Sequence, residues 1–177
     1  MIDTLLPVSS QSLVLRGFVL EDAPKVYALS QEPGMRTWIP DQVYENYAVA
    51  LGVIRDLIGM YLDPGTPARA PYVLGVCLRD SLELIGHVGL SPLNGQIEIG
   101  FSIEERYQGR GYASEAVRAM LSWAFPRFSM SRVLGIVASD NAASCRVLQR
   151  AGFELANESS GSLHGRSGLI RTYHRLR

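Results

Sequence analysis

Residues 105–117, ERYQGRGYASEAV, place two glycines around an arginine directly before a segment with helical periodicity. Glycine loses more conformational entropy on folding than other residues, so two this close together indicate a special turn. Backbone N–H groups at the start of a helix have no partners inside it, and the helix dipole favours negative charge there. The stretch therefore predicts a site where a phosphate or pyrophosphate meets the backbone.

Two familiar phosphate-binding turns do not fit this stretch. A P-loop needs Lys followed by Ser or Thr after its second glycine, where this chain has Tyr112 and Ala113. A dinucleotide-binding turn needs Gly or Ala at the sixth position, here Ser114, and an acidic residue about 20 residues further on, which is missing. The remaining alternative is a strand–helix turn that binds nothing.

The cysteines and histidines do not form a recognisable metal site. Cys77 and Cys145 lack metal-ligand spacing and form no disulfide framework. His87, His164 and His174 are not paired with other ligand residues at metal-binding distances along the chain, so core or surface roles are expected for each. We predict that no metal is bound.

The elements that would position the turn show two periodicities. Apolar residues at 97, 99, 101 and 103 alternate with Glu98, Gly100 and Ser102, which predicts a strand with one core face. Apolar residues at 113, 116, 117, 120, 121 and 124 have helical spacing, and Pro126 is expected to end that helix. Strands are predicted at 12–16, 72–78, 84–90, 96–103, 132–139, 153–156 and 169–176, helices at 21–31, 43–61, 113–124 and 141–151, and loops at 63–67 and 157–168.

Composition places the chain among globular proteins. Of its 177 residues, 47% are hydrophobic and 19% charged, which predicts one mixed α/β domain over residues 1–177. No apolar run approaches a membrane span, and the N-terminus lacks the basic region of a signal peptide, so a cytoplasmic, non-membrane protein is expected.

Charge is unevenly distributed along the chain. Residues 1–100 carry a net charge of −5 and residues 101–177 a net charge of +5. Such polarity would suit a protein that binds an anion with one half and a cation with the other, or it arises by chance from surface charges. The absence of a Lys-rich run interleaved with aromatics argues against nucleic-acid binding.

The spacing Gln108-x-x-Gly111-x-Ala113 resembles the Gln/Arg-x-x-Gly-x-Gly/Ala signature of the GNAT N-acetyltransferase superfamily. Residues 98–101, 141–144 and 152–153 occur in the family's order, and the clear matches cover residues 97–153. The arrangement is most similar to the branch that acetylates ribosomal-protein N-termini at alanine or serine, which also has a leading Leu-x-Leu-Arg strand, as at residues 13–16.

The resemblance implies a GNAT fold: a mixed, mostly antiparallel central sheet of six to seven strands flanked by about four helices. It also implies direct acetyl transfer from acetyl-CoA to a primary amine without an acyl-enzyme, so Cys145 is not expected to be a nucleophile. It is compatible with a homodimer. The residues that it assigns to the cofactor are Phe101, Ile103, Gln108, Gly109, Arg110, Gly111, Tyr112, Ala113, Ser114, Asn141, Ser144 and Arg146.

Two catalytic residues follow from the same resemblance. Glu98 matches a position that carries the general base in some members; alternatively it binds the substrate cation or is a solvated strand carboxylate. Ser144 matches the serine proposed to contact the CoA sulfur, or it bonds to the helix backbone. Many members have a proton-donating tyrosine where this chain has Leu148. Asn141 is either a pantetheine contact or a helix cap.

The acceptor is left open by the sequence. Protein N-termini, polyamines, aminoglycosides and amino-acid derivatives all remain, as does a non-catalytic acetyl-CoA sensor. Arg146 and Arg150 either meet the nucleotide phosphates or are exposed helix charges. Trp38, Tyr44 and Tyr47 either line the acceptor pocket or belong to the core.

Overall fold

The computed structural model describes residues 7–62 and 65–177. Residues 63 and 64 of the predicted loop, and the N-terminal residues 1–6 used to judge a signal peptide, lie outside the described residues. Within the described part, none of the helices combines the length and the hydropathy needed to cross a membrane.

The strands are β1 Val8–Ser9, β2 Leu13–Arg16, β3 Tyr72–Leu78, β4 Leu84–Leu93, β5 Gln96–Ile103, β6 Arg132–Ala138, β7 Glu154–Leu163 and β8 Arg166–Leu176. The α-helices are α1 Ala23–Ser30, α2 Pro33–Trp38, α3 Tyr47–Leu62, α4 Tyr112–Arg127 and α5 Ala142–Arg150, with 3-10 turns η1 Leu20–Asp22, η2 Pro40–Gln42 and η3 Glu105–Tyr107.

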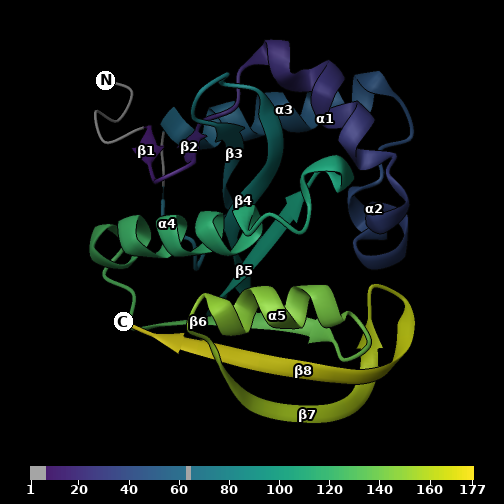
Figure 1. Ribbon diagram of the computed structural model, residues 1–177, viewed down its shortest axis with the longest axis vertical. Helices are drawn as coiled ribbons and strands as arrows, with labels where there is room; N and C mark the ends of the chain where they lie inside the picture. Colours follow the sequence, from purple (N-terminus) through teal and green to yellow (C-terminus); the bar gives the residue numbers. More distant parts are fainter. Residues whose placement is uncertain (1–6, 63–64) are drawn as a thin grey trace.

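The strands form one mixed sheet in the order β1-β2-β3-β4-β5-β6-β8-β7. Every neighbouring pair is antiparallel except β5 and β6, which are parallel. Helices α4 and α5 lie over one face, while α1 and α3 lie at the top of Figure 1, where a second buried cluster packs them against β3 and β4. The main core lies between the sheet and α4, where the predicted stripe of Ala116, Val117, Met120, Leu121 and Ala124 is buried.

The sheet divides between β5 and β6. Along β4, strand β5 is paired from Gln96 to Ile103. Between β5 and β6, by contrast, the described residues contain one register pair, Glu98 with Leu134. Beyond that pair the two parallel strands separate, and residues of both line a cleft. We call this point of separation the fork of the sheet, and the candidate site lies there.

The described residues contain eight strands and five α-helices, slightly more than the predicted six to seven and about four. The mixed, mostly antiparallel architecture is confirmed. One added helix is α2, which the sequence analysis missed although Pro33 stands at its first position, where proline is favoured. Helix α3 begins at Tyr47 rather than at residue 43, because Asn46 Oδ1 accepts a hydrogen bond from Val49 N at 3.1 Å.

The predicted loop at 157–168 is wrong. It forms most of a long hairpin, in which β7 pairs with β8 as far as Leu163 and Arg166. The turn residues His164 and Gly165 have φ of 50° and 78°, the conformation of a tight two-residue hairpin turn. Because β7 is an edge strand exposed on both faces, it has no apolar alternation to reveal it. A smaller correction concerns Pro126, which lies inside α4 one residue before its end.

Candidate active site

A cleft of about 570 Å³ opens where β5 and β6 part. One side is formed by the end of β5, the turn before α4 and the start of α5. The other side is formed by α2, η2 and the tip of the β7–β8 hairpin. Of the residues assigned above, those that line the cleft are Glu98, Phe101, Ile103, Gln108, Gly109, Gly111, Tyr112, Ala113, Ser114, Asn141, Ser144, Arg146 and Arg150.

The turn before α4 exposes backbone to the cleft. Gly109 and Gly111 have φ of 76° and 86°, a left-handed conformation that glycine adopts without strain, and Gly111 is the N-cap of α4. A Cβ built on either glycine meets nothing within 4 Å, so the space in front of the backbone is open. The N–H groups of the first turn of α4 have no partners inside the helix. This arrangement fits a pyrophosphate.

The neighbours of the glycines hold the turn in place. Gln108 Nε2 donates to the carbonyl oxygen of Ile103 at 2.8 Å, which ties the turn to the end of β5. The Arg110 side chain does not line the cleft; it lies 5.4 Å from the Tyr107 ring centroid and donates to the carbonyl oxygen of Arg106. Any contact of Arg110 with a ligand in the cleft would therefore come from its backbone.

Asn141 and Ser144 meet at the start of α5. Asn141 Oδ1 accepts a hydrogen bond from Ser144 N at 3.1 Å, so Asn141 caps the helix. The amide NH₂ of Asn141 is left for other contacts on the cleft side. Ser144 is half-buried and lines the cleft, whereas the adjacent Cys145 is buried in the core.

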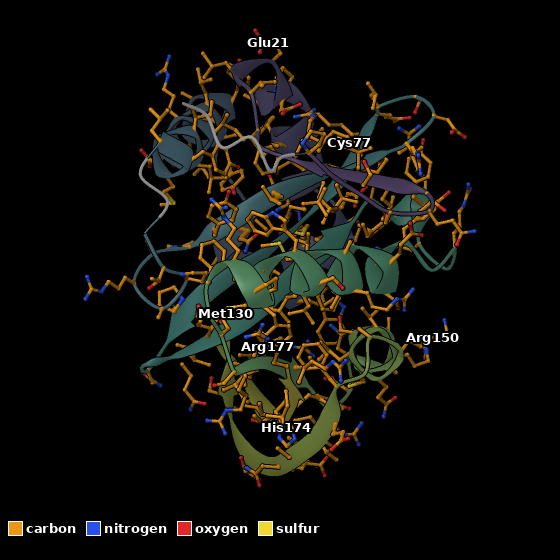
Figure 2. The ribbon with its side chains drawn as sticks, turned by 90° about the vertical axis from the view of Figure 1, so that its left-hand side faces the viewer. Glu21, Cys77, Met130, Arg150, His174 and Arg177 are labelled. Atoms are coloured by element: carbon orange, nitrogen blue, oxygen red, sulfur yellow. The ribbon has the colours of Figure 1, made fainter. Side chains whose placement is uncertain are left out.

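The remaining side of α5 divides between core and solvent. Leu148 is fully buried and packs against Gly135 of β6, where it supplies no proton donor. Arg146 and Arg150 are both exposed, and the Arg150 side chain projects from the end of α5 toward solvent (Figure 2). Both arginines border the cleft, so they add positive charge at its rim.

Glu98 stands at the fork of the sheet and is half-buried. Burial raises the pKa of its carboxyl group, an effect that the charge of His164 partly opposes. A carboxylate with a raised pKa binds a proton more tightly than an exposed glutamate does. Next to it, Gly100 has open space where a side chain would stand, which leaves room beside the carboxylate.

The side of the cleft opposite α5 contains Trp38, one of the three aromatic residues considered for the acceptor pocket, and Met35, which the sequence analysis did not select. Trp38 lines the cleft, together with Met35 of α2, whose sulfur lies 3.2 Å from the Ser102 hydroxyl. Tyr44 and Tyr47 do not line it, and Tyr47 is exposed rather than part of the core. The sequence signals for this side were Trp38 itself and Pro33 at the start of α2.

Two glutamates on the cleft cap each other's turns. The Glu105 carboxylate accepts a hydrogen bond from Gly34 N at 3.0 Å, and the Glu32 carboxylate accepts one from Glu105 N at 3.1 Å. Burial raises the pKa of Glu32; the hydrogen bond from Glu105 N opposes this effect, and the charges of Glu105 and Glu104 add to it. The reciprocal contacts join the start of α2 to η3, which directly precedes the glycine turn.

The histidines are separated from one another. His164 at the tip of the hairpin lies 2.7 Å from Asp41 and lines the cleft. His87 in β4 does not line the cleft, and burial lowers its pKa to about 4. His174 lies 3.9 Å from Glu154 on the neighbouring strand. In residues 7–62 and 65–177, no group of three or more His, Cys, Asp or Glu side chains is arranged to hold a metal ion.

The chain matches the acetyltransferase (GNAT) domain family over residues 12–154, and it therefore belongs to that family. It is 27% identical over 169 residues to the uncharacterized N-acetyltransferase YoaA of Bacillus subtilis (strain 168), covering 94% of this chain and 86% of the relative. A GNAT-family acetyltransferase from Bacillus anthracis has a similar structure, with a TM-score of 0.82, 20% identity and 97% and 98% of the two chains covered.

A second solved structure with this fold is RimL, a ribosomal L7/L12 alpha-N-protein acetyltransferase in complex with coenzyme A. Its TM-score is 0.79 and its identity 20%, over 97% of each chain. The family assignment confirms the predicted fold class and the prediction of an acyltransferase that uses acetyl-CoA as co-substrate. The amine that receives the acetyl group is a separate question.

Proposed function

We propose that this protein transfers the acetyl group of acetyl-CoA directly to a primary amine bound between Glu98 and α2. The observation that carries the proposal is the half-buried Glu98 carboxylate, whose pKa is raised, at the fork of a cleft that also contains the glycine turn. Acetyl-CoA supplies the activated acyl group as a thioester. The residues of the chain supply binding, orientation and proton transfer.

The donor half of the cleft holds the CoA moiety in this proposal. The N–H groups at Gly109, Gly111 and the first turn of α4 bind the pyrophosphate, because two glycines leave their approach open. Arg146 at the rim attracts the phosphates. Ser144 and the Asn141 amide contact the arm that leads to the thioester.

The proton transfers follow from the same assignment. Glu98 accepts the proton that the amine loses as its nitrogen forms the new C–N bond, either directly or through a water molecule. The C–S bond breaks, and the Ser144 hydroxyl donates a hydrogen bond to the sulfur that leaves. Since Leu148 supplies no donor, Ser144 is the side chain on α5 to which we assign this role.

Two classes of acceptor deserve separate consideration. The first is the α-amine of a protein N-terminus, which the similarity to RimL supports at the level of fold. An α-amine has a pKa near 8, against about 10.4 for lysine, so it needs less help to lose its proton. The second is a small-molecule amine, which the contact between His164 and Asp41 at the acceptor end favours.

Release of CoA thiol from acetyl-CoA, measured with a panel of peptides, polyamines, aminoglycosides and amino-acid amides, tests the proposal. Transfer to at least one amine, slowed in Ser144→Ala with nearly unchanged acetyl-CoA affinity, is the expected result. Binding of acetyl-CoA without transfer to any amine would instead support a sensor. The cytoplasmic location, the homodimer and a single domain over residues 1–177 stay predictions.

A further inference from the structure

The tip of the β7–β8 hairpin, residues 163–166, reaches across the acceptor end of the cleft; we call these four residues the strap. His164 Nδ1 lies 2.7 Å from Asp41 Oδ2 in η2. The Arg166 guanidinium lies over the Trp38 ring of α2, 4.5 Å from its centroid. Figure 1 shows the turn of the yellow hairpin next to α2.

Arg166 joins the two sides of the cleft. While its guanidinium stacks on Trp38 on the acceptor side, one nitrogen lies 3.1 Å from Oδ2 of Asp140, the residue before the N-cap of α5 on the donor side. Leu163, His164 and Arg166 all line the cleft. The strap therefore forms part of the wall of the acceptor site and is fastened at both ends.

The backbone that carries the strap is regular, but the side-chain contacts that hold the strap against the cleft are weak. Because β7 and β8 stay paired up to Leu163 and Arg166, the tip is held by a regular hairpin rather than by a loose loop. The Asp41 side chain, by contrast, is 73% exposed, and exposed ion pairs contribute little to stability. Contacts of this kind can open without disturbing the rest of the fold.

We infer that the strap sets the length of the acceptor that this enzyme accepts, and that its closed position selects short amines over polypeptide N-termini. The inference rests on the proposed transfer to an amine at Glu98. A short acceptor fits beneath the strap with its amine at the carboxylate. The residues that follow the N-terminus of a polypeptide must pass the strap, so the contacts of His164 and Arg166 have to open first.

Asp41 offers a test because its side chain fastens the strap without lining the cleft. Asp41→Ala removes the carboxylate that meets His164, and Asp41→Lys replaces it with a longer side chain of opposite charge. The acceptors are serine amide, seryl-alanine amide and a hexapeptide amide that begins with serine, so that the reacting amine stays the same while the length grows. The matched control is Glu158→Ala, which removes an ion pair to Arg171 on the same hairpin away from its tip.

We expect the wild type to have a higher kcat/KM for serine amide than for the hexapeptide. Asp41→Ala should raise the relative kcat/KM of the hexapeptide about threefold and Asp41→Lys at least fivefold, with acetyl-CoA affinity unchanged. Hydrogen exchange at residues 162–168 should increase in both Asp41 variants, which reports opening independently of activity. The Glu158→Ala protein should keep the wild-type preference.

An unchanged length preference in active Asp41 variants, or unchanged exchange at the tip, would overturn the role of the strap and leave the proposed function intact. Acetylation of the hexapeptide in preference to serine amide by the wild type would overturn it as well, as would transfer confined to amines outside the serine series. A wild type that transfers acetyl to no amine would overturn both proposals together.

Discussion

Glu98 and Leu134 form the register pair at which the parallel strands β5 and β6 meet before they part. The carboxylate of Glu98 therefore stands where the sheet ends and the cleft begins. Burial at this position raises its pKa, and the raised pKa links the geometry of the sheet to the chemistry of the site.

Glu98→Gln should lower kcat/KM by about 100-fold, a typical contribution of a general base. The base acts when it is deprotonated, so the wild-type rate should fall as the pH drops through the raised pKa of Glu98. In the variant, the part of this fall that comes from Glu98 should disappear from the pH–rate profile. Only the pH dependence that comes from titration of the acceptor amine should remain. A pH–rate profile of unchanged shape in Glu98→Gln would remove Glu98 from the role of base.

The same substitution should stabilise the protein at neutral pH. Because the pKa of Glu98 is raised on folding, its contribution to stability is fully present below the unfolded pKa and is lost as the pH rises through the folded pKa. Glu98→Gln avoids this loss, so its melting temperature should exceed that of the wild type at pH 7. The difference should vanish near pH 4. A variant less stable than the wild type at pH 7 would show that the ionised carboxylate is held by favourable contacts.

Much of the donor half of the site could be predicted because its signals are local. The glycines at 109 and 111 and the apolar stripe of α4 lie within 16 residues, and each has a direct physical reason for its type. The cap, one of the two roles considered for Asn141, could be predicted for the same reason, since capping residues act within one turn of their helix.

The acceptor half could not be predicted because its parts are distant in the sequence. Trp38 and Arg166 come into contact because the β7–β8 hairpin is long enough to carry Arg166 to α2. The sequence analysis predicted a loop for much of this hairpin. Its outer strand is solvated on both faces, so backbone pairing with β8 forms it without any apolar pattern. Within the hairpin the local signal was Gly165 in the tight turn, but its neighbour His164 is not a usual turn residue.

Substitution of Asn141 should separate its two roles. Asn141→Ala should lower the free energy of unfolding by about 1 kcal/mol, because the cap on Ser144 N is lost. Asn141→Asp keeps an oxygen for the cap and should retain stability, while its negative charge and missing NH₂ should weaken acetyl-CoA binding in calorimetry. The matched control is Asn46, which caps α3 away from the cleft. Asn46→Asp should leave acetyl-CoA affinity unchanged, and full affinity in Asn141→Asp would reduce Asn141 to a cap.

His87 should make stability depend on pH in the acidic range. Its folded pKa of about 4 lies below the ordinary value of 6.5, so the unfolded chain binds the extra proton first. Wild-type stability should therefore fall relative to His87→Gln as the pH drops from 7 to 4, by about 3 kcal/mol at most. Urea unfolding of both proteins at several pH values measures this difference. A constant difference between them would show that folding does not lower the pKa of His87.

Gly111→Val should weaken acetyl-CoA binding by more than tenfold, or about 1.4 kcal/mol. The φ of 86° strains any L side chain and should cost about 1–3 kcal/mol of stability, and the β-branched group would occupy the open space in front of the N–H groups.

Gly95→Val is the matched control, because Gly95 has a φ of 77°, open surroundings and no place on the cleft. Both variants should lose stability, but only Gly111→Val should fail to gain melting temperature from added CoA, as binding linkage requires. Arg110→Ala should bind CoA almost normally, since that side chain lies over the Tyr107 ring and does not itself line the cleft. Full thermal stabilisation of Gly111→Val by CoA would mean that the turn is structural and that the cofactor binds elsewhere.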